Sequence, residues 1–322
     1  MPYFSIIIPV YNRPDEVNDL LESLSKQTYK DFEVIIVEDG STVCCADAVK
    51  RYSRIVDIHY YYKENEGRSI ARNYGLERAV GSYFIFFDSD CVIPEGYFEA
   101  LNAVLNRHAA HDSFSDVQKA INYSMTSFLT TGGIRGGRVQ LEKFTPRTFN
   151  MGFSREVYDR VGGFREMFSE DIDMSTRIRQ AGFGISLIRN AFVYHKRRIS
   201  MRLFFRQIYI FGMSRISLYL LYPDTLKLVH WFPACFVIGT LAMIVASFFW
   251  WPAILPLAIY LFAVFLVSWC VNKRLKIAAL SVVASIIQLG GYGMGFLKAF
   301  FYKVLLGRGR DEAEEVRLRK GK

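Results

Sequence analysis

Residues 83–96 read YFIFFDSDCVIPEG. The bulky apolar and aromatic residues at 83–87 predict a buried strand. This strand runs directly into Asp88 and Asp90, with one serine between them. Two carboxylates so close in the chain repel each other. They therefore lie either in a solvated turn or beside a cation, and the surrounding elements decide which interpretation is better.

This strand is part of an alternating series of strands and helices. Short β-branched or aromatic runs at 4–11, 32–39 and 55–61 predict three more strands. Residues 14–27 and 68–79 carry apolar side chains at helical spacing. Continuous apolar strands that alternate with amphipathic helices predict an α/β domain, in which helices cover both faces of a mostly parallel sheet.

Three of the predicted strands end in polar residues at the edge where such sheets bind ligands. These ends are Pro9-Val10-Tyr11, Glu38-Asp39-Gly40 and Asp88-Ser89-Asp90. A DxD pair alone occurs by chance about once in a chain of this length. At this edge, however, the two carboxylates suit Mg²⁺ or Mn²⁺, which takes oxygen ligands and bridges to phosphate. Such a cation would relieve their repulsion and neutralise a leaving diphosphate, whereas the alternative remains a simple turn.

Two further polar sites have both a structural and a functional interpretation. Glu38 and Asp39 end a strand, where they either form a turn or hydrogen-bond to a nucleobase or ribose. His195 follows an apolar run, and it is either structural or in contact with a diphosphate or a metal ion. The sequence alone leaves both choices open.

Arg68 and Arg72 are one helical turn apart, so they share a face of the predicted helix at 68–79. Two interpretations of this pair remain open. The two side chains bind phosphates, or they pair with Glu64 and Glu66 on the protein surface.

Residues 169–182 predict another helix, with Ser169 as its N-cap and Gly182 at its end. Glu170 and Asp171 lie in the first turn, where acidic residues ordinarily stabilise a helix N-terminus. The functional alternative is a general base, because a carboxylate held at the site can take a proton from an acceptor hydroxyl.

The C-terminal third of the chain is strongly apolar. Segments at about 231–251, 252–271 and 277–297 each approach the roughly 20 residues that cross a bilayer. A basic loop at 272–276 favours a return to the cytoplasm after two crossings. The glycine-rich third segment then either crosses and leaves the basic tail outside, or bends back or lies in the interface. We expect a cytoplasmic tail.

Charge and cysteine content restrict the cellular setting. The net charge of +9 is concentrated beside the apolar segments, which favours anionic lipid over nucleic acid as the partner. Residues 201–229 mix arginines with aromatic and aliphatic residues, which predicts a helix in the membrane interface or, equally, one packed on the first domain. The start of the chain lacks a signal peptide pattern, and the five cysteines lack zinc or disulfide spacing. A cytoplasmic first domain is expected.

Taken in order, several motifs resemble those of the family 2 glycosyltransferases of GT-A fold. They are PVYNRP (9–14), VEDGS (37–41), GRSIARNYGLERAVGSYFIFFDSD (67–90), NMGFSREVYDRVGGFREMF (150–168) and SEDIDMSTRIRQAG (169–182). The resemblance covers about residues 3–200, and its specificity lies in the ordered set. With apolar segments following, the chain is similar to membrane-associated bacterial members that build surface polysaccharides.

The resemblance implies a Rossmann-like domain and a C-terminal membrane-helix module. The expected divisions are a catalytic domain at 1–200, an interfacial linker helix at 201–229, a transmembrane module at 230–306 and a basic tail at 307–322. The implied reaction is inverting, metal-dependent transfer of a sugar from a nucleotide-diphospho-sugar to a hydroxyl of a lipid-linked glycan. The implied location is the bacterial inner membrane, with the catalytic domain facing the cytoplasm.

The resemblance also assigns roles to residues. Asp171 is implied as the catalytic base, with Glu170 and Gly163 on the acceptor side. The implied donor-binding residues are Pro9, Tyr11, Glu38, Asp39, Arg68, Arg72, Asp88 and Ser89. The implied ligands of Mn²⁺ or Mg²⁺ are Asp88, Asp90 and His195. Glu38 stands where an aspartate is common in this family.

The resemblance leaves alternative functions open. Processive members carry a QxxRW motif, which RQIYIFG at 206–212 does not match, so a single-addition transferase is expected. A polyprenyl-phosphate sugar synthase is a second enzymatic interpretation. A membrane-tethered scaffold that binds a nucleotide-sugar is the non-enzymatic alternative.

Overall fold

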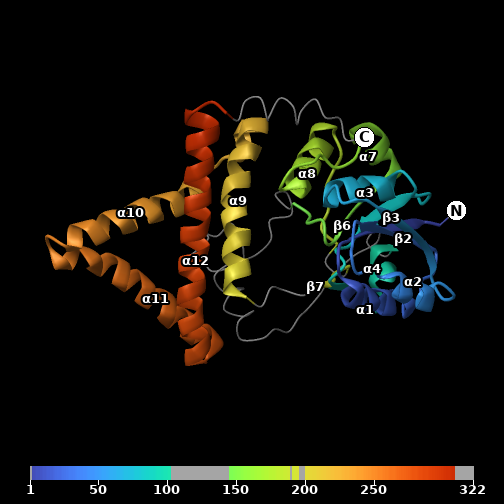
Figure 1. The fold of residues 1–322 in the computed structure, drawn as a ribbon, viewed down its shortest axis with the longest axis horizontal. Coiled ribbons are helices and arrows are strands. Elements are labelled where there is room, and N and C mark those ends of the chain that lie inside the picture. The colour runs from blue at the N-terminus through green and yellow to red at the C-terminus, as the bar shows by residue number, and fades with distance from the viewer. Residues whose placement is uncertain (1, 103–144, 189–190, 196–199, 309–322) are drawn as a thin grey trace. The chain divides into compact units, whose positions relative to one another are not determined.

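The computed structural model describes residues 2–102, 145–188, 191–195 and 200–308, and these residues form two units (Figure 1). The first unit holds the described residues up to 195, and the second holds residues 200–308. The first unit is an α/β domain, and the second is built from long apolar helices. The predicted fold class is therefore confirmed.

The first unit is built on a five-stranded sheet with the strand order β3-β2-β1-β4-β6. Its strands are β1 (Phe4–Val10), β2 (Phe32–Asp39), β3 (Asp57–Lys63), β4 (Tyr83–Phe86) and β6 (Met151–Ser154). The first four run parallel, and β6 pairs antiparallel with β4. A second, two-stranded sheet pairs β5 (Cys91–Val92) with β7 (Tyr194–His195).

Helices cover both faces of the sheet (Figure 1). They are α1 (Pro14–Ser25), α2 (Ala46–Tyr52), α3 (Arg68–Leu76), α4 (Tyr97–Asn102), α7 (Arg155–Val161) and α8 (Glu170–Gln180). Successive strand residues point to opposite faces. Ile6 and Ile8 accordingly belong to the core under α1 and α2, whereas Ile7 belongs to the core under α3, α7 and α8. Two buried faces explain the unbroken apolar runs at residues 6–8 of β1 and 34–37 of β2.

The second unit holds four long helices joined by short turns. The helices are α9 (Met201–Leu221), α10 (Phe232–Ser247), α11 (Leu255–Asn272) and α12 (Leu275–Ala299). The turns are the 3-10 segments Pro223–Thr225, Leu228–Trp231 and Trp251–Ile254, and a π-helical segment at Phe300–Leu305 follows α12. Three segments are long and apolar enough to cross a membrane by length and composition, namely Leu228–Ser247, Trp251–Asn272 and Leu275–Leu305.

Glycines bring α9 and α12 into close contact along their length. A Cβ on Gly212 of α9 would clash with the backbone oxygen of Tyr292, and one on Gly295 of α12 would clash with that of Tyr209. Small residues that let helix backbones approach are typical of helix pairs in membranes. The glycine-rich part of the third apolar segment is therefore a packing surface within a continuous helix, and it is not a bend.

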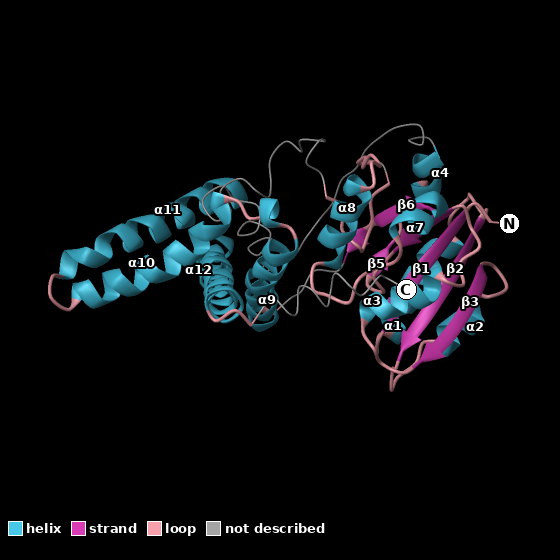
Figure 2. Ribbon diagram, turned by 90° about the horizontal axis from the view of Figure 1, so that it is seen from above, coloured by secondary structure: helices cyan, strands magenta, loops and turns pink. Residues whose placement is uncertain are grey.

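The helices α10 and α11 form a hairpin (Figures 1 and 2). Its two legs run away from α12, across the axis of that helix, and the turn at 248–254 joins their far ends. The first leg contacts α12 where Gly293 lies against the backbone of Pro233. The second leg contacts it through a hydrogen bond of 2.8 Å from Ser268 Oγ to Ser281 Oγ. The aromatic turn is the most exposed part of the hairpin, because Phe248 and Phe249 are 83% and 90% exposed.

Candidate active site

The carboxyl ends of three adjacent parallel strands bring the predicted site residues to one edge. β1 lies between β2 and β4 in the sheet. Tyr11, Asp39 and Asp88 follow or end these strands, so the edge predicted from chain order exists in the fold. Tyr11 is 53% exposed and Pro9 is partly exposed, whereas Ser89 is buried.

Asp39 fixes the loop that leads into α3. Its Oδ1 accepts hydrogen bonds from Lys63 Nζ at 2.9 Å and from the backbone N–H of Glu66 at 3.0 Å. Its Oδ2 accepts from the backbone N–H of Gly67 at 2.9 Å. Gly67 has a positive φ of 97°, a conformation that favours glycine. The Asp39 carboxylate thus fixes the loop that precedes α3, the helix that carries Arg68 and Arg72.

Glu38 points to the opposite face of the sheet from Asp39 and is fully buried. Its Oε2 accepts hydrogen bonds from the Cys45 backbone N–H and the Tyr60 hydroxyl, both at 3.1 Å. The Cys45 thiol lies 3.0 Å from the same oxygen. Burial, and then the contact with Glu38, raise the pKa of that thiol, so it stays protonated and donates at neutral pH. Glu38 therefore holds the loop before α2 through Cys45. Its predicted role in donor binding stays a prediction.

A chain of ion pairs joins α3, α8 and the end of β4. Arg68 Nη2 lies 2.8 Å from Glu170 Oε2, and Arg72 Nη1 lies 3.1 Å from Glu170 Oε1. Arg72 Nη2 then reaches Asp88 Oδ1 at 2.8 Å. The side chains of Arg72 and Glu170 are only 1% and 3% exposed. Among the described ion pairs, the arginines thus pair with Glu170 and Asp88, and the alternative of surface pairs with Glu64 and Glu66 is wrong.

The two aspartates of the DxD pair are each bound by an arginine from a different element. Arg72 holds Asp88, and Arg13 Nη1 lies 3.2 Å from Asp90 Oδ2. The side chains of the aspartates are 35% and 17% exposed, so both reach the surface of the edge. Positive charge therefore compensates their repulsion in this structure.

The donor set at this edge fits a hard divalent cation, because both candidate ligands are carboxylates that reach solvent. A cation held by two side chains would complete its shell with diphosphate and water oxygens. Within the described ranges, no group of three His, Cys, Asp or Glu side chains is placed to hold a metal ion. The backbone of His195 pairs with that of Cys91, but the His195 side chain lies outside the described residues.

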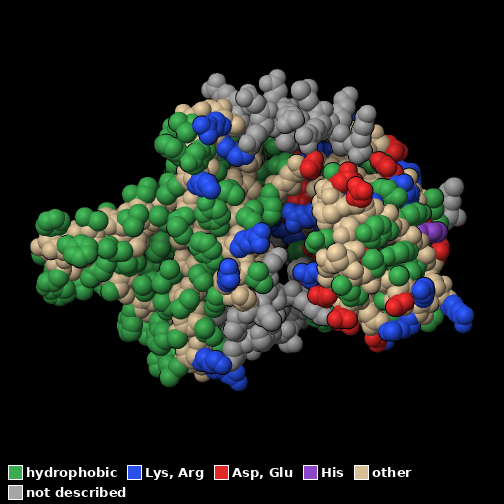
Figure 3. Space-filling view, viewed as in Figure 1, with side chains coloured by type: hydrophobic (Ala, Val, Ile, Leu, Met, Phe, Trp, Pro, Cys, Tyr) green, Lys and Arg blue, Asp and Glu red, His purple; other side chains and the backbone are tan. Residues whose placement is uncertain are grey.

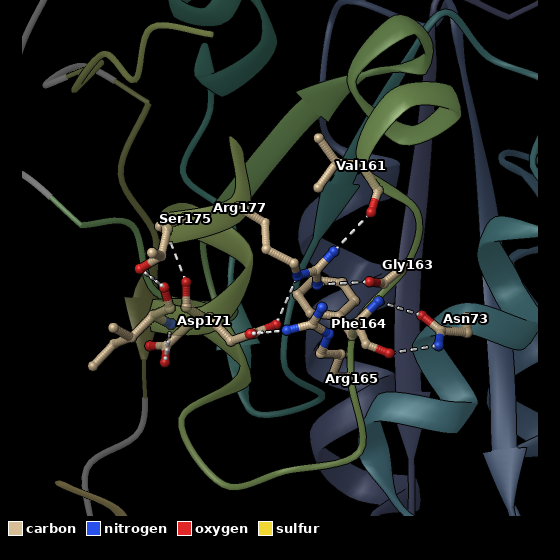
Figure 4. Close-up of polar contacts among 11 residues, drawn as sticks. Asn73, Val161, Gly163, Phe164, Arg165, Asp171, Ser175 and Arg177 are labelled. Carbon is tan, nitrogen blue, oxygen red and sulfur yellow. Dashed lines mark hydrogen bonds and ion pairs between the residues drawn. The ribbon is translucent and has the colours of Figure 1, made fainter. Parts of the chain in front are cut away.

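Asp171 lies in the first turn of α8 (Figure 4). Its carboxylate pairs with Arg147. Its Oδ2 is 2.9 Å from Arg147 Nη1, and its Oδ1 accepts from the backbone N–H of Ile172 at 2.9 Å. Ser169 precedes the helix in a left-handed conformation with φ of 71°, and its side chain makes no capping hydrogen bond. Ser169 is therefore the N-cap residue, as predicted, but its backbone oxygen rather than its hydroxyl accepts from the N–H of Ile172 and of Asp173.

The loop before α8 is fixed to α3 and to α8 itself. Arg177 donates to the backbone oxygens of Val161 and Gly163, both at 2.8 Å (Figure 4). Asn73 exchanges two hydrogen bonds with the backbone of Phe164, at 2.7 and 2.8 Å. A Cβ on Gly163 would lie 2.5 Å from Asn73 Oδ1, so this close approach requires glycine. The acceptor-side roles of Gly163 and Glu170 remain predictions.

Three basic residues at the site were missed by reasoning from the sequence. They are Arg13, Lys63 and Arg147, which pair with Asp90, Asp39 and Asp171. Arg13 lies in the PVYNRP motif and could have been assigned to the site from the sequence, because a charged residue just after a strand end lies at the edge where ligands bind. Arg147 has no such signal, since its pairing depends on a chain reversal before β6.

Comparison with known proteins gives matches over most of the chain. The model described as glycosyl transferase family 2 matches residues 5–162, and the one described as glycosyl transferase family 21 matches residues 142–309. An uncharacterized glycosyltransferase of Rickettsia felis is 43% identical over 86 residues, which are 27% of this chain and 14% of that protein. The putative teichuronic acid biosynthesis glycosyltransferase TuaG of Bacillus subtilis is 43% identical over 91 residues, 28% of this chain and 36% of that protein. The aligned stretch is thus a minor part of these relatives.

Among solved structures, the chain resembles the mannosyltransferase PcManGT from Pyrobaculum calidifontis, in complex with GDP-Man and Mn²⁺. The TM-score is 0.61 at 17% identity, over 90% of this chain and 87% of that one. At this identity the likeness concerns the fold alone. The ordered motifs, the mostly parallel sheet and the matching models agree, and the chain belongs to glycosyltransferase family 2, with the GT-A fold.

Proposed function

We propose that the protein is an inverting, metal-dependent glycosyltransferase. It moves a sugar from a nucleotide-diphospho-sugar to a hydroxyl of a lipid-linked glycan during assembly of a cell-surface polysaccharide. The observation that carries this proposal is the chain of ion pairs from Asp88 through Arg72 to Glu170, the direct neighbour of Asp171. It runs from a carboxylate suited to bind a metal ion to the residue that directly precedes the candidate general base.

The relatives support the choice of substrates. PcManGT binds GDP-Man and Mn²⁺, and TuaG is named for teichuronic acid biosynthesis. We assign Pro9, Tyr11 and Asp39 to the nucleotide pocket at the edge of β1 and β2. Ser89 and the two arginines of α3 are assigned to the diphosphate. Lipid binding by the second unit would bring the protein to the inner membrane, with the first unit in the cytoplasm.

Asp88 and Asp90 would hold the divalent cation, with His195 as a further candidate ligand. When bound, the cation neutralises the diphosphate that leaves the sugar. Arg13 and Arg72 already lie at these carboxylates. Guanidinium groups are suited to phosphate oxygens, so Arg13 and Arg72 would help to bind the diphosphate.

Asp171 would take the proton of the acceptor hydroxyl as the oxygen attacks the sugar carbon. Its ion pair with Arg147 and its bond to the Ile172 N–H keep the carboxylate in one orientation. The side chain of Asp171 is 12% exposed and that of Arg147 is 41% exposed. An acceptor can therefore reach Asp171 from the side on which Arg147 lies.

The decisive experiment compares Asp171→Asn with Asp159→Asn in the full chain, in detergent, against a panel of UDP-, GDP- and dTDP-sugars. Asp159 is exposed on α7, so its replacement is the matched control. We expect Asp171→Asn to bind the donor normally and to lose transfer by about 10²-fold or more. Near-normal turnover in this variant would contradict the base assignment. Tight donor binding without transfer by the parent chain would favour the scaffold interpretation.

Metal dependence is tested separately with a chelator. We expect EDTA to stop transfer, because it removes the cation that would neutralise the leaving diphosphate. Added Mn²⁺ or Mg²⁺ should restore transfer. Asp90→Asn should raise the Mn²⁺ concentration needed for half-maximal activity. Full activity in the chelator would remove the metal role of Asp88 and Asp90.

One observation favours a second candidate, a polyprenyl-phosphate sugar synthase. Arg147 is partly exposed beside Asp171, where it can bind an acceptor phosphate. A phosphate acceptor is already ionised and needs no base. In that case Asp171→Asn would keep most of its activity with polyprenyl phosphate, whereas Arg147→Ala would raise the KM for that acceptor.

A further inference from the structure

Charge is divided sharply between parts of the second unit. Residues 228–272, which contain α10, α11 and their turn, hold no Lys, Arg, Asp or Glu. The rest of 200–308 holds ten Lys and Arg residues against one acid, Asp224. In Figure 3 the hairpin shows an apolar surface, and the basic side chains of this unit lie over α9 and α12.

The two legs of the hairpin hold α12 at separate points. The contacts at Ser281 and Gly293 are twelve residues apart, which is about 18 Å along a helix. From each contact to the turn at 248–254 the leg runs about fourteen residues, or about 21 Å. A triangle with these sides places the turn about 19 Å from the axis of α12.

An orientation in which α12 crosses the membrane conflicts with the charges on α9. The glycine contacts bind α9 along α12, so α9 would cross as well. Arg206 and Arg215 lie about 8 and 21 Å along α9, well inside a hydrocarbon layer about 30 Å thick. Arginine in this layer is strongly unfavourable. In the same orientation the uncharged hairpin would lie parallel to the membrane plane, near the middle of the bilayer. The helices that carry charge would then be the ones that span the membrane.

An orientation with α9 and α12 in the plane of the membrane surface removes this conflict. All ten basic residues then lie at the level of the headgroups, where anionic lipids attract them. Only the uncharged hairpin enters the hydrocarbon. Its turn, about 19 Å below α12, passes the midplane and stops short of the far side.

The hydrogen bonds of the turn suit a position inside hydrocarbon, where every backbone N–H needs a partner. Phe248, Phe249 and Trp250 donate to the backbone oxygens of Val245 and Ala246, at 2.9–3.2 Å. Ala253 donates to that of Trp250 at 3.0 Å, and Pro252 has no N–H. Most backbone donors of the turn are thus satisfied by the last residues of α10 or within the turn itself.

We propose that α9 and α12 lie in the plane of an anionic membrane surface and that α10 and α11 enter the bilayer as a hairpin that returns to the same side. Both ends of α12 then face the compartment that holds the first unit. The proposal concerns how the second unit meets the lipid, and it stands whether or not the first unit transfers sugar.

The test uses single cysteines in the full chain. The native cysteines Cys44, Cys45, Cys91, Cys235 and Cys270 are first replaced by serine. One cysteine is then introduced per variant: Lys273→Cys before α12, Arg308→Cys after it, or Trp250→Cys in the turn. Restored Cys44, which is exposed in the first unit, marks the side of that unit. Right-side-out and inside-out vesicles are treated with a membrane-impermeant maleimide, and only variants that keep the parent's unfolding temperature are scored.

We expect the cysteines at 273 and 308 to be labelled from the same side as Cys44, and the cysteine at 250 to be labelled only after detergent is added. Labelling of 273 and 308 from opposite sides would show that α12 crosses and would overturn the in-plane pair. Labelling of 250 from the side opposite Cys44 would show that the hairpin spans, and would overturn its return within the bilayer.

Discussion

Glu170 shows how a single residue of this site can be understood only from its partners. As one of two acids opening a helix, it has an ordinary explanation in the helix dipole. In the fold its carboxylate is 3% exposed and lies between Arg68 and Arg72 of another helix. A buried acid that binds two arginines positions those arginines. The predicted contact of Glu170 with an acceptor gains no support from the structure, because the side chain is buried.

Replacement of Glu170 by glutamine tests this positioning role. It leaves the buried Arg72 without one of its two anionic partners, and we expect a loss of about 3 kcal/mol in the free energy of unfolding. Denaturant unfolding of the full chain in detergent measures this value. The control is Glu77→Gln, since Glu77 is half-exposed and lies 3.7 Å from Arg78, where little change is expected. Equal stability of both variants would show that the buried pair is dispensable.

The sequence predicted the acids of the site better than their cations. Asp39, Asp88 and Asp171 each stand at a strand end or a helix start, and such positions can be located by local pattern. Arg13 and Asp90 are 77 positions apart, and Arg72 and Glu170 are 98 apart. No local period relates such residues, so their pairing appears only when the strands are placed side by side.

At the scale of elements, periodicity located α1, α3 and α8 within about three residues of their bounds. Each has a regular apolar face against the sheet. β6 was not predicted, because it enters the sheet antiparallel from a distant part of the chain. The glycines of α12 were interpreted as the sign of a bend or of an interfacial segment. The helix is continuous, so the bend is wrong, and contacts with α9, which no pattern within α12 reveals, explain the glycines.

A pair of alanine substitutions in α12 tests the glycine contacts. Gly295→Ala would place a Cβ against the backbone oxygen of Tyr209, which must shift, so we expect a loss of about 1–3 kcal/mol in stability. Gly290→Ala meets no atom within 4 Å and should be neutral or slightly stabilising, since alanine favours helix. Thermal unfolding in one detergent compares the two variants. A larger loss from Gly290→Ala would refute the packing role.

At the scale of the whole molecule, the apolar hairpin should make this an integral membrane protein despite its basic surface. We expect alkaline carbonate and high salt, which release proteins held by charge, to leave most of the parent chain in the membrane fraction. Aspartates in place of Phe249 and Trp250 should move a large fraction to the supernatant, because charge in hydrocarbon is unfavourable. Ile55→Asp is the control, as Ile55 is exposed in the first unit. Equal retention of the two proteins would contradict the role of the turn as an anchor.

The order of the second unit along the chain also sets an order of assembly. The close contact of Gly212 cannot form until α12 has been synthesised, because its partner Tyr292 lies 80 residues later in the sequence. A ribosome adds about 5–20 residues per second, so the delay is roughly 4–16 s. During that time the newly made α9 has no α12 to pack against, and the hairpin between them is synthesised first. Insertion of α10 and α11 therefore precedes closure of the glycine contacts, and α12 completes the unit.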